Sequence, residues 1–159
     1  AVYLFTNVLN TVLLHTYFKN NTAFYGGAIY SRNSNTGIII QSSIFQSNIA
    51  SGSGGAIALS SSHMGANIYD STFLMNEATD DGGAIELITS NGIGHLIEGN
   101  VVLMSGCVFD LNHAVNGNGG AIHVEIDNYI EVRECDFTNN KAIRGSNATI
   151  RSESKTTWT

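Results

Sequence analysis

Apolar residues recur at every second position in short segments along most of the chain. One pair of such positions lies seven and five residues before a phenylalanine, as Ile38 and Ile40 do before Phe45. Another pair follows a Gly-Gly-Ala sequence, as Ile85 and Leu87 do. Alternation with a period of two is typical of strands that bury one face. The pattern therefore predicts short strands joined by turns rich in Gly, Ser and Asn.

These strands belong to an internal repeat with two motifs. The first motif, Gly-Gly-Ala-Ile, occurs four times and begins at Gly26, Gly54, Gly82 and Gly119. The second, Phe-x-x-Asn, occurs five times, with its residues at Phe18 and Asn21, Phe45 and Asn48, Phe73 and Asn76, Phe109 and Asn112, and Phe137 and Asn140. Successive phenylalanines are 27, 28, 36 and 28 residues apart. The long interval indicates an insertion loop at about 88–100.

A unit of about 28 residues that holds three short strands predicts a single-stranded, right-handed parallel β-helix of about five coils. Residues 1–159 then form one segment of a longer solenoid. Stacked coils lie ~4.8 Å apart, so equivalent residues should form ladders. We expect the Phe ladder in the core and the Asn ladder along a turn. A leucine-rich repeat is the structural alternative, but it needs a helix on its convex side.

Together, the two motifs resemble the paired repeat motifs of the chlamydial polymorphic outer membrane proteins, and the resemblance covers residues 18 to about 150. Those proteins are autotransporters whose β-helical passenger is displayed at the cell surface and acts as an adhesin. The resemblance implies an extracellular or cell-surface location. It also makes the ten Phe and Asn motif residues candidate adhesive positions, although core packing and turn hydrogen bonds explain the same residues.

Charge and composition narrow the choice of partners. Seven basic and 13 acidic side chains give a formal charge of −6, which argues against nucleic acid as a partner. No apolar run reaches the ~20 residues that span a bilayer, so we expect no membrane insertion by this segment. Faces rich in Asn, Ser and Thr suit contact with proteins or glycans of a host or neighbouring cell. Exposed strand edges at the end coils would also let copies of the chain stack end to end into filaments.

Candidate chemistry is sparse. Asp80 and Asp81 are the only adjacent acidic pair, and we interpret them as a solvated turn, with a weak Ca²⁺ contact as the alternative. Glu86 and His123 occupy the same outward position in successive units and should form a surface pair. We expect no catalytic residues, no metal site and no cofactor. The prediction is a non-enzymatic extracellular scaffold for adhesion or structural display. A segment of a pectate-lyase-like, polysaccharide-active enzyme is the alternative.

Two further features concern covalent modification. Cys107 and Cys135 each stand two residues before a ladder Phe in successive units, where Ser or Thr stands elsewhere. Stacked coils would bring them within the range of a disulfide, or leave them as two small buried thiols. The sequons at Asn20 and Asn147 are candidate N-glycosylation sites in a eukaryotic secreted protein.

Overall fold

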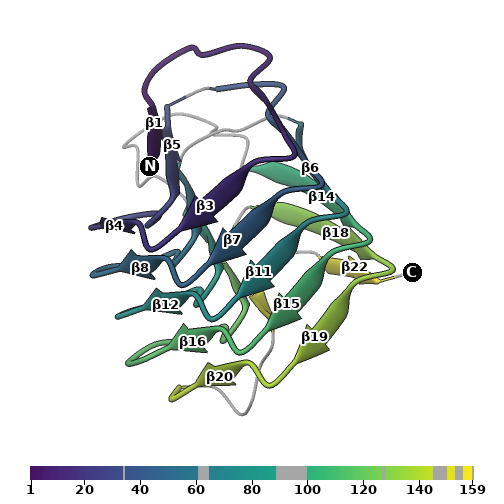
Figure 1. Ribbon diagram of the computed structural model, residues 1–159. Helices are drawn as coiled ribbons and strands as arrows, with labels where there is room; N and C mark the ends of the chain where they lie inside the picture. Colours follow the sequence, from purple (N-terminus) through teal and green to yellow (C-terminus); the bar gives the residue numbers. More distant parts are fainter. Residues whose placement is uncertain are drawn as a thin grey trace.

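The computed structural model describes residues 1–33, 35–60, 65–88, 100–126, 128–144, 150–152 and 156–158. Within these ranges the regular structure consists of strands, which form four parallel sheets (Figure 1). Sheet 1 contains β1 (Val2–Leu4), β5 (Ile29–Arg32), β9 (Ile57–Ser60), β13 (Ile85–Ile88), β17 (Ile122–Val124) and β21 (Ile150–Ser152). Sheet 2 contains β2 (Val12–Leu14), β6 (Ile39–Gln41), β10 (Ala66–Tyr69), β14 (Val101–Ser105), β18 (Tyr129–Arg133) and β22 (Thr156–Trp158).

Sheets 3 and 4 are built from shorter strands. Sheet 3 contains β3 (Tyr17–Lys19), β7 (Ile44–Gln46), β11 (Thr72–Leu74), β15 (Val108–Asp110) and β19 (Asp136–Thr138). Sheet 4 contains β4 (Thr22–Ala23), β8 (Ile49–Ala50), β12 (Glu77–Ala78), β16 (His113–Ala114) and β20 (Lys141–Ala142).

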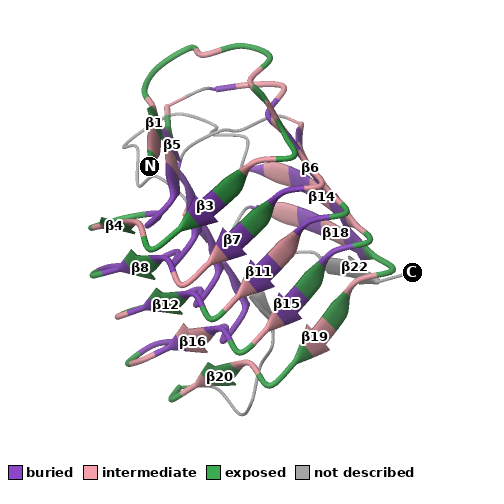
Figure 2. Ribbon diagram, in the orientation of Figure 1, coloured by how far each residue is buried: buried purple, intermediate pink, exposed green. Residues whose placement is uncertain are grey.

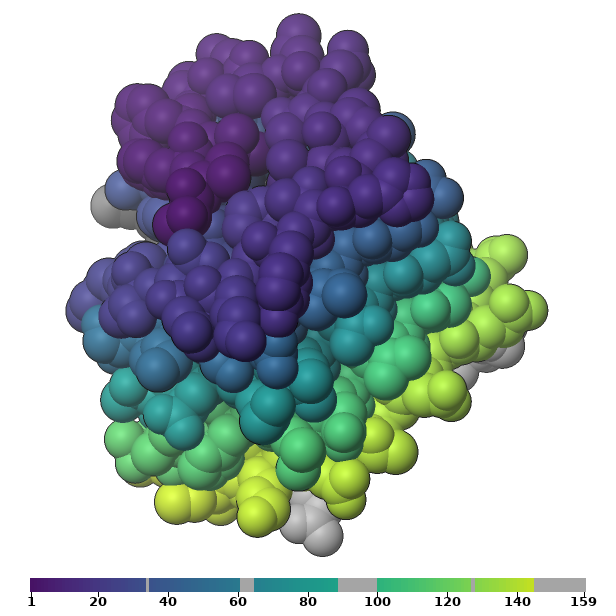
Figure 3. All heavy atoms as spheres, in the orientation of Figure 1, coloured from purple at the N-terminus to yellow at the C-terminus, as the bar shows by residue number. Residues whose placement is uncertain are grey.

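Each coil visits sheets 1, 2, 3 and 4 in turn and then stacks on the previous coil, so the predicted parallel β-solenoid is confirmed. A coil has four strands and not the three predicted, because the residues around the Asn motif form the separate short strands of sheet 4. Four full turns separate β3 from β19, close to the five coils predicted. The successive coils are visible as stacked bands of colour in Figure 3. The register joins equivalent motif positions, such as Phe45 with Phe73 and Phe73 with Phe109. The predicted insertion at 88–100 begins at the end of β13, and its residues 89–99 lie outside the described residues.

The coil turns at corners where one residue has a left-handed backbone conformation. The corner before sheet 3 uses His15, Ser42, Asp70, Gly106 and Glu134. The corner between sheets 3 and 4 uses Asn20, Ser47, Met75, Leu111 and Asn139. The corner before sheet 1 uses the first glycine of each Gly-Gly pair, such as Gly54 with φ of 71°. Glycine and asparagine adopt this conformation readily, whereas other residues are strained by ~1–2 kcal/mol.

The second glycine of each pair is required for a different reason. A Cβ atom on Gly55 would lie 2.1 Å from the carbonyl oxygen of Gly83 in the next coil. A Cβ on Gly83 would lie 2.1 Å from the carbonyl oxygen of Gly120. Successive coils therefore approach so closely at this turn that only glycine fits.

The core runs the length of the solenoid between the sheets, and buried positions form continuous stripes (Figure 2). Five phenylalanine rings stack through it, with centroids 4.6–5.0 Å apart and neighbouring planes within 11° of parallel. Phe45, Phe73 and Phe109 are completely buried. Aliphatic side chains of sheets 1 and 2 and the alanines of the Gly-Gly-Ala turns fill most of the remaining interior. The predicted core position of the Phe ladder is confirmed.

Candidate functional site

The ten motif residues lie mainly inside the solenoid, where they join the coils. The Oδ1 atom of Asn76 accepts hydrogen bonds from both the backbone N–H and the Nδ2 atom of Asn48, each at 3.0 Å. Asn76 Nδ2 donates to Asn112 Oδ1 and to the backbone carbonyl of Phe45, also at 3.0 Å. The same pattern continues from Asn21 to Asn140. Asn48, Asn76 and Asn112 are fully buried, so a partner molecule does not reach them.

A second asparagine ladder lies at the corner between sheets 1 and 2, and the sequence analysis did not detect it. Asn100 donates from its backbone N–H and its Nδ2 to Asn128 Oδ1, at 2.8 and 2.6 Å. Asn35 accepts from the backbone N–H of Val8 at 2.7 Å. All three asparagines are buried. In the sequence, this second ladder is indicated only by an Asn nine or ten residues before a ladder Phe. Such an Asn appears three times, too seldom to stand out as a motif.

Glu86 and His123 lie side by side as predicted, but the expectation of a surface pair was wrong. Glu86 is 1% exposed and His123 is 5% exposed. The Nδ1 atom of His123 lies 2.9 Å from Oε1 and 3.1 Å from Oε2 of Glu86. Strand alternation does place both on the outer side of sheet 1. However, the Gly-Gly turn folds back over that side, and a Cβ on Gly82 would lie 2.8 Å from Glu86 Oε2.

Burial changes the acid–base properties of this pair. Desolvation raises the pKa of Glu86 to about 8, against the lowering effect of the hydrogen bond and charge of His123. Desolvation lowers the pKa of His123, but its hydrogen bond to Glu86 and the charges of Glu86, Asp81 and Glu125 outweigh this and raise the pKa overall. Among the described residues, no partner bonds the buried Nε2 atom of His123. Both raised pKa values mean that the pair releases its protons at a higher pH than exposed Glu and His side chains would.

Asp81 has a structural role in its turn. Its Oδ1 atom accepts hydrogen bonds from the backbone N–H and the Nδ2 of Asn118, at 2.6 and 3.0 Å. Asp81 therefore caps the equivalent turn of the next coil and is not simply solvated. Within the described ranges, no three His, Cys, Asp or Glu side chains come together as metal ligands would.

Cys107 and Cys135 stack in successive coils at the corner before sheet 3. Ser43 and Ser71 form the same ladder in earlier coils, where Ser71 Oγ accepts from the backbone N–H of Ser43 at 3.2 Å. In the same way, Cys135 Sγ accepts from the backbone N–H of Cys107 at 3.3 Å. Both cysteines are free thiols in this structure, Cys107 buried and Cys135 half-buried. Hydrogen bonding to Cys107 lowers the pKa of Cys135 to about 7, and the pKa of Cys107 is raised.

The corner between sheets 3 and 4 carries an exposed apolar surface, which we call the corner ridge. It is centred on Met75 and Leu111, which are 44% and 46% exposed and occupy the same corner in adjacent coils. Ile49, which begins β8 directly after this corner, adds a further exposed apolar side chain. Met75 and Leu111 both have φ above 50°, whereas Asn20 and Asn139 hold this corner in the first and last coils. Long apolar side chains thus occupy strained positions while nearly half of their surface stays exposed.

Of the two candidate glycosylation sites, Asn20 is exposed at the first corner between sheets 3 and 4. Asn147 lies outside the described residues.

Comparison with known proteins identifies the repeat. Residues 15–32, 42–60 and 106–125 each match the Chlamydia polymorphic membrane protein repeat. Each matched segment runs from the corner before sheet 3 to the strand after a Gly-Gly turn. The chain therefore carries repeats of this type, as its motifs predicted. No curated protein and no solved structure matched. No helix long and apolar enough to cross a membrane is found in the described part of the chain.

Proposed function

We propose that this chain, with its repeats of the Chlamydia polymorphic membrane protein type, is a non-enzymatic segment of an extracellular β-helix. It is displayed on a cell surface, where it adheres to a protein or glycan of a host or neighbouring cell. The repeat match and the solenoid support a surface role. The corner ridge carries the argument for adhesion, because exposed apolar patches commonly mark interaction surfaces.

The backbone of the corner ridge strengthens this argument. Asparagine at positions 75 and 111 would be less strained and more soluble, and the chain uses it at the equivalent positions 20 and 139. Met75 and Leu111 therefore strain the corner while nearly half of their surface stays exposed to solvent. A contact with a partner accounts for their presence, because the apolar area would then be removed from water.

Replacing both residues, Met75→Asn and Leu111→Asn, tests the proposal. Thermal unfolding should show a more stable protein, by roughly 1 kcal/mol per site, because the strain is relieved. Binding of the labelled chain to cultured epithelial cells, measured by flow cytometry, should fall at least tenfold. Ile143→Asn is the matched control, since Ile143 is 70% exposed, lies outside the corner ridge and should leave binding unchanged. Full cell binding by the double variant would contradict this role of the ridge.

End-to-end stacking is a second part of the proposal. Strands β3 and β19 stand at opposite ends of sheet 3, and among the described residues each pairs with a single neighbouring strand. Strands at the edge of a sheet recruit strands from other molecules unless they are covered. Sedimentation velocity should therefore show species that grow with protein concentration. A single monomeric species at all concentrations would argue against filament formation by this segment.

The enzyme alternative receives no support from the candidate acid and base. A polysaccharide-active site needs its carboxylates and bases within reach of a substrate. Glu86 and His123 are buried against each other beneath the Gly82 turn. The geometry therefore favours adhesion through the outer faces of the solenoid over catalysis.

A further inference from the structure

The outward positions of sheet 1 form a row that changes character along the solenoid. Tyr3 pairs with Tyr30, Tyr30 pairs with Ala58, and the row then continues to Glu86 and His123. The rings of Tyr3 and Tyr30 stack with their centroids 5.3 Å apart and their planes at 11°. Beyond them, the row continues inward, because Ala58 is completely buried. The first coils thus present an aromatic surface on the outside of sheet 1.

Phe24 and Tyr25 form the second side of this surface, in the turn that leads from sheet 4 to sheet 1. The Tyr25 ring lies 5.4 Å from the Tyr30 ring, and Phe24 meets Tyr25 edge to face at 4.7 Å and 87°. Both rings rest on Gly52 of the next coil. A Cβ atom there would lie 3.1 Å from a ring carbon of Phe24 and 3.2 Å from one of Tyr25. Because Gly52 has no side chain, the rings of Phe24 and Tyr25 in the preceding coil can pack closely against it.

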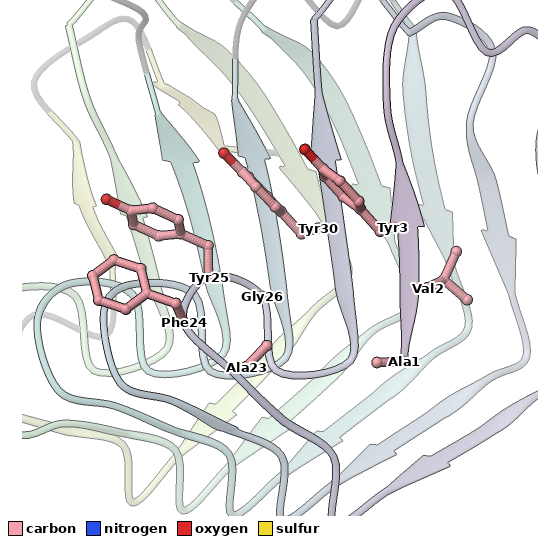
Figure 4. Close-up of a pocket in the computed structure, with 8 residues that line it drawn as sticks. All are labelled: Ala1, Val2, Tyr3, Ala23, Phe24, Tyr25, Gly26 and Tyr30. Atoms are coloured by element: carbon pink, nitrogen blue, oxygen red, sulfur yellow. The ribbon is translucent and has the colours of Figure 1, made fainter.

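The four aromatic residues line a cavity of about 260 Å³, together with Ala1, Val2, Ala23 and Gly26 (Figure 4). Tyr3 is 57% exposed, Phe24 62% and Tyr25 37%. Figure 4 shows the hydroxyl groups of Tyr3, Tyr25 and Tyr30 pointing the same way. The cavity is close in size to the smaller sites that bind small molecules, and it combines apolar walls with a few polar groups.

We propose that this cavity binds a saccharide, an inference that rests on the surface role proposed above and names a ligand class for it. A sugar ring has an apolar C–H face and a rim of hydroxyl groups. The aromatic rings can stack on the apolar C–H face of the sugar. The tyrosine hydroxyls donate and accept hydrogen bonds, so they can bind the hydroxyl groups of the sugar. The aromatic side chains are held by ring stacking and by Gly52, so little ordering is needed on binding.

Charge near the cavity discriminates against the main competing ligand class. Aromatic cages also bind quaternary ammonium groups, by cation–π attraction. Here, the positive charge of Arg32 acts on the Tyr30 hydroxyl, which is also hydrogen-bonded with Ser60. The eight lining residues include no carboxylate side chain. This environment disfavours a cation and suits neutral or acidic sugars.

Saturation-transfer NMR with three trisaccharides tests the inference: the N-acetylglucosamine trimer, maltotriose and sialyllactose. We expect transfer from the protein to at least one of them. The double variant Tyr3→Ser and Phe24→Ser should weaken that binding at least tenfold. Tyr17→Ser is the matched control, because Tyr17 is 55% exposed but lies on sheet 3, and it should leave binding unchanged. Gly52→Ala, whose Cβ would press on the backbone oxygen of Phe24 at 3.0 Å and on both rings, should weaken binding several-fold with an unchanged circular dichroism spectrum.

Absence of transfer to all three sugars would overturn the inference, and so would a wild-type affinity in both the double variant and Gly52→Ala. These outcomes are separate from the cell-binding experiment. A chain that still binds cells through the corner ridge but binds no trisaccharide would disprove the saccharide site alone. If the chain binds a trisaccharide through the aromatic cavity but does not bind cells, the proposal of adhesion through the corner ridge is contradicted and the saccharide site is not.

Discussion

Glu86 and His123 place a titratable pair where solvent cannot stabilise its charged forms. The pKa of each residue is raised above its ordinary value, so the folded chain holds protons that the unfolded chain releases. Folding stability therefore decreases with rising pH wherever the unfolded state has lost the proton and the folded state has not. For Glu86 this window runs from its ordinary value of 4.5 to about 8. For His123 the loss begins at its ordinary value of 6.5.

The melting temperature should accordingly be highest near pH 4.5 and fall steadily as the pH rises to about 8. Glu86→Gln removes the ionisable carboxyl and should flatten most of this dependence. Differential scanning calorimetry across this range measures both proteins. Glu77→Gln is the control, because Glu77 contacts His113 at 3.5 Å on the surface, where both side chains are substantially exposed. A Glu86→Gln variant with the pH profile of the wild type would show that the pair does not control it.

Cys135 is expected to be the more reactive of the two thiols. A thiolate is the attacking form of cysteine, and the pKa of Cys135 is lowered to about 7 while Cys107 is buried. Iodoacetamide should modify Cys135 with a rate that is half-maximal near pH 7 and leave Cys107 unmodified, as peptide mass spectrometry would show. Cys135→Ser uses the residue found at this corner in earlier coils and should abolish labelling. Equal labelling of both cysteines would contradict the prediction.

The same experiment bears on the disulfide. Under oxidising conditions, a bond between Cys107 and Cys135 would reduce the intact mass by two hydrogen atoms and block alkylation of both residues. The stacking of these cysteines leaves a disulfide and two small thiols as alternatives, and this mass distinguishes them.

At the scale of elements, the ladders make the contribution of a residue depend on its place in the stack. Phe73 stacks on Phe45 and Phe109, whereas Phe18 stacks on Phe45 at the first coil and is 8% exposed. Phe73→Ala should lower the free energy of unfolding by ~3–5 kcal/mol, since it opens a cavity in the middle of the stack. Phe18→Ala should have a clearly smaller effect. Urea denaturation of both variants measures the difference, and equal losses would argue against the ladder interpretation.

The repeat made most elements predictable. Phe and Asn recur at a nearly constant interval, so the Phe core and the first Asn ladder follow from spacing alone. The second Asn ladder is harder to detect, because Asn35, Asn100 and Asn128 do not recur in every coil. The burial of Glu86 could not be read from strand alternation. Alternation assigns a side of the sheet, but it carries no information about a turn that folds over that side.

The exposed surfaces were the least predictable part. The corner ridge depends on which residues adopt positive φ, and the sequence motif leaves that position open between Phe and Asn. The aromatic cavity depends on rings from two different coils and on Gly52 in the second of them. Such contacts arise from the stacking of coils, and a repeat with variable outward positions does not specify them.

For the whole molecule, stacking means that each coil is stabilised mainly by its two neighbours. Ser42 and Asp70 are equivalent corner residues, with φ of 50° and 49°. Deleting residues 42–69 therefore removes one complete coil and joins β6 to the next corner in register. We expect this variant to fold with a β-sheet circular dichroism spectrum and a moderately lower melting temperature. Deleting only 42–55 would join β6 to β9 and should prevent folding. If the variant that lacks one complete coil does not fold, the statement that each coil is stabilised mainly by its two neighbours would be contradicted.

The direction of the ladder bonds also determines how the molecule responds to mechanical tension. The Asn side-chain bonds and the sheet hydrogen bonds cross from one coil to the next, so they lie along the axis of the solenoid. A pull on the two ends of the chain detaches a terminal coil first, because that coil is bonded to one neighbouring coil, whereas an interior coil is bonded to two. The chain would unspool one coil at a time, each coil of 28 residues releasing about 95 Å of extended length. On a cell surface, such a segment would lengthen in steps under shear and so keep its attachment while dissipating the load.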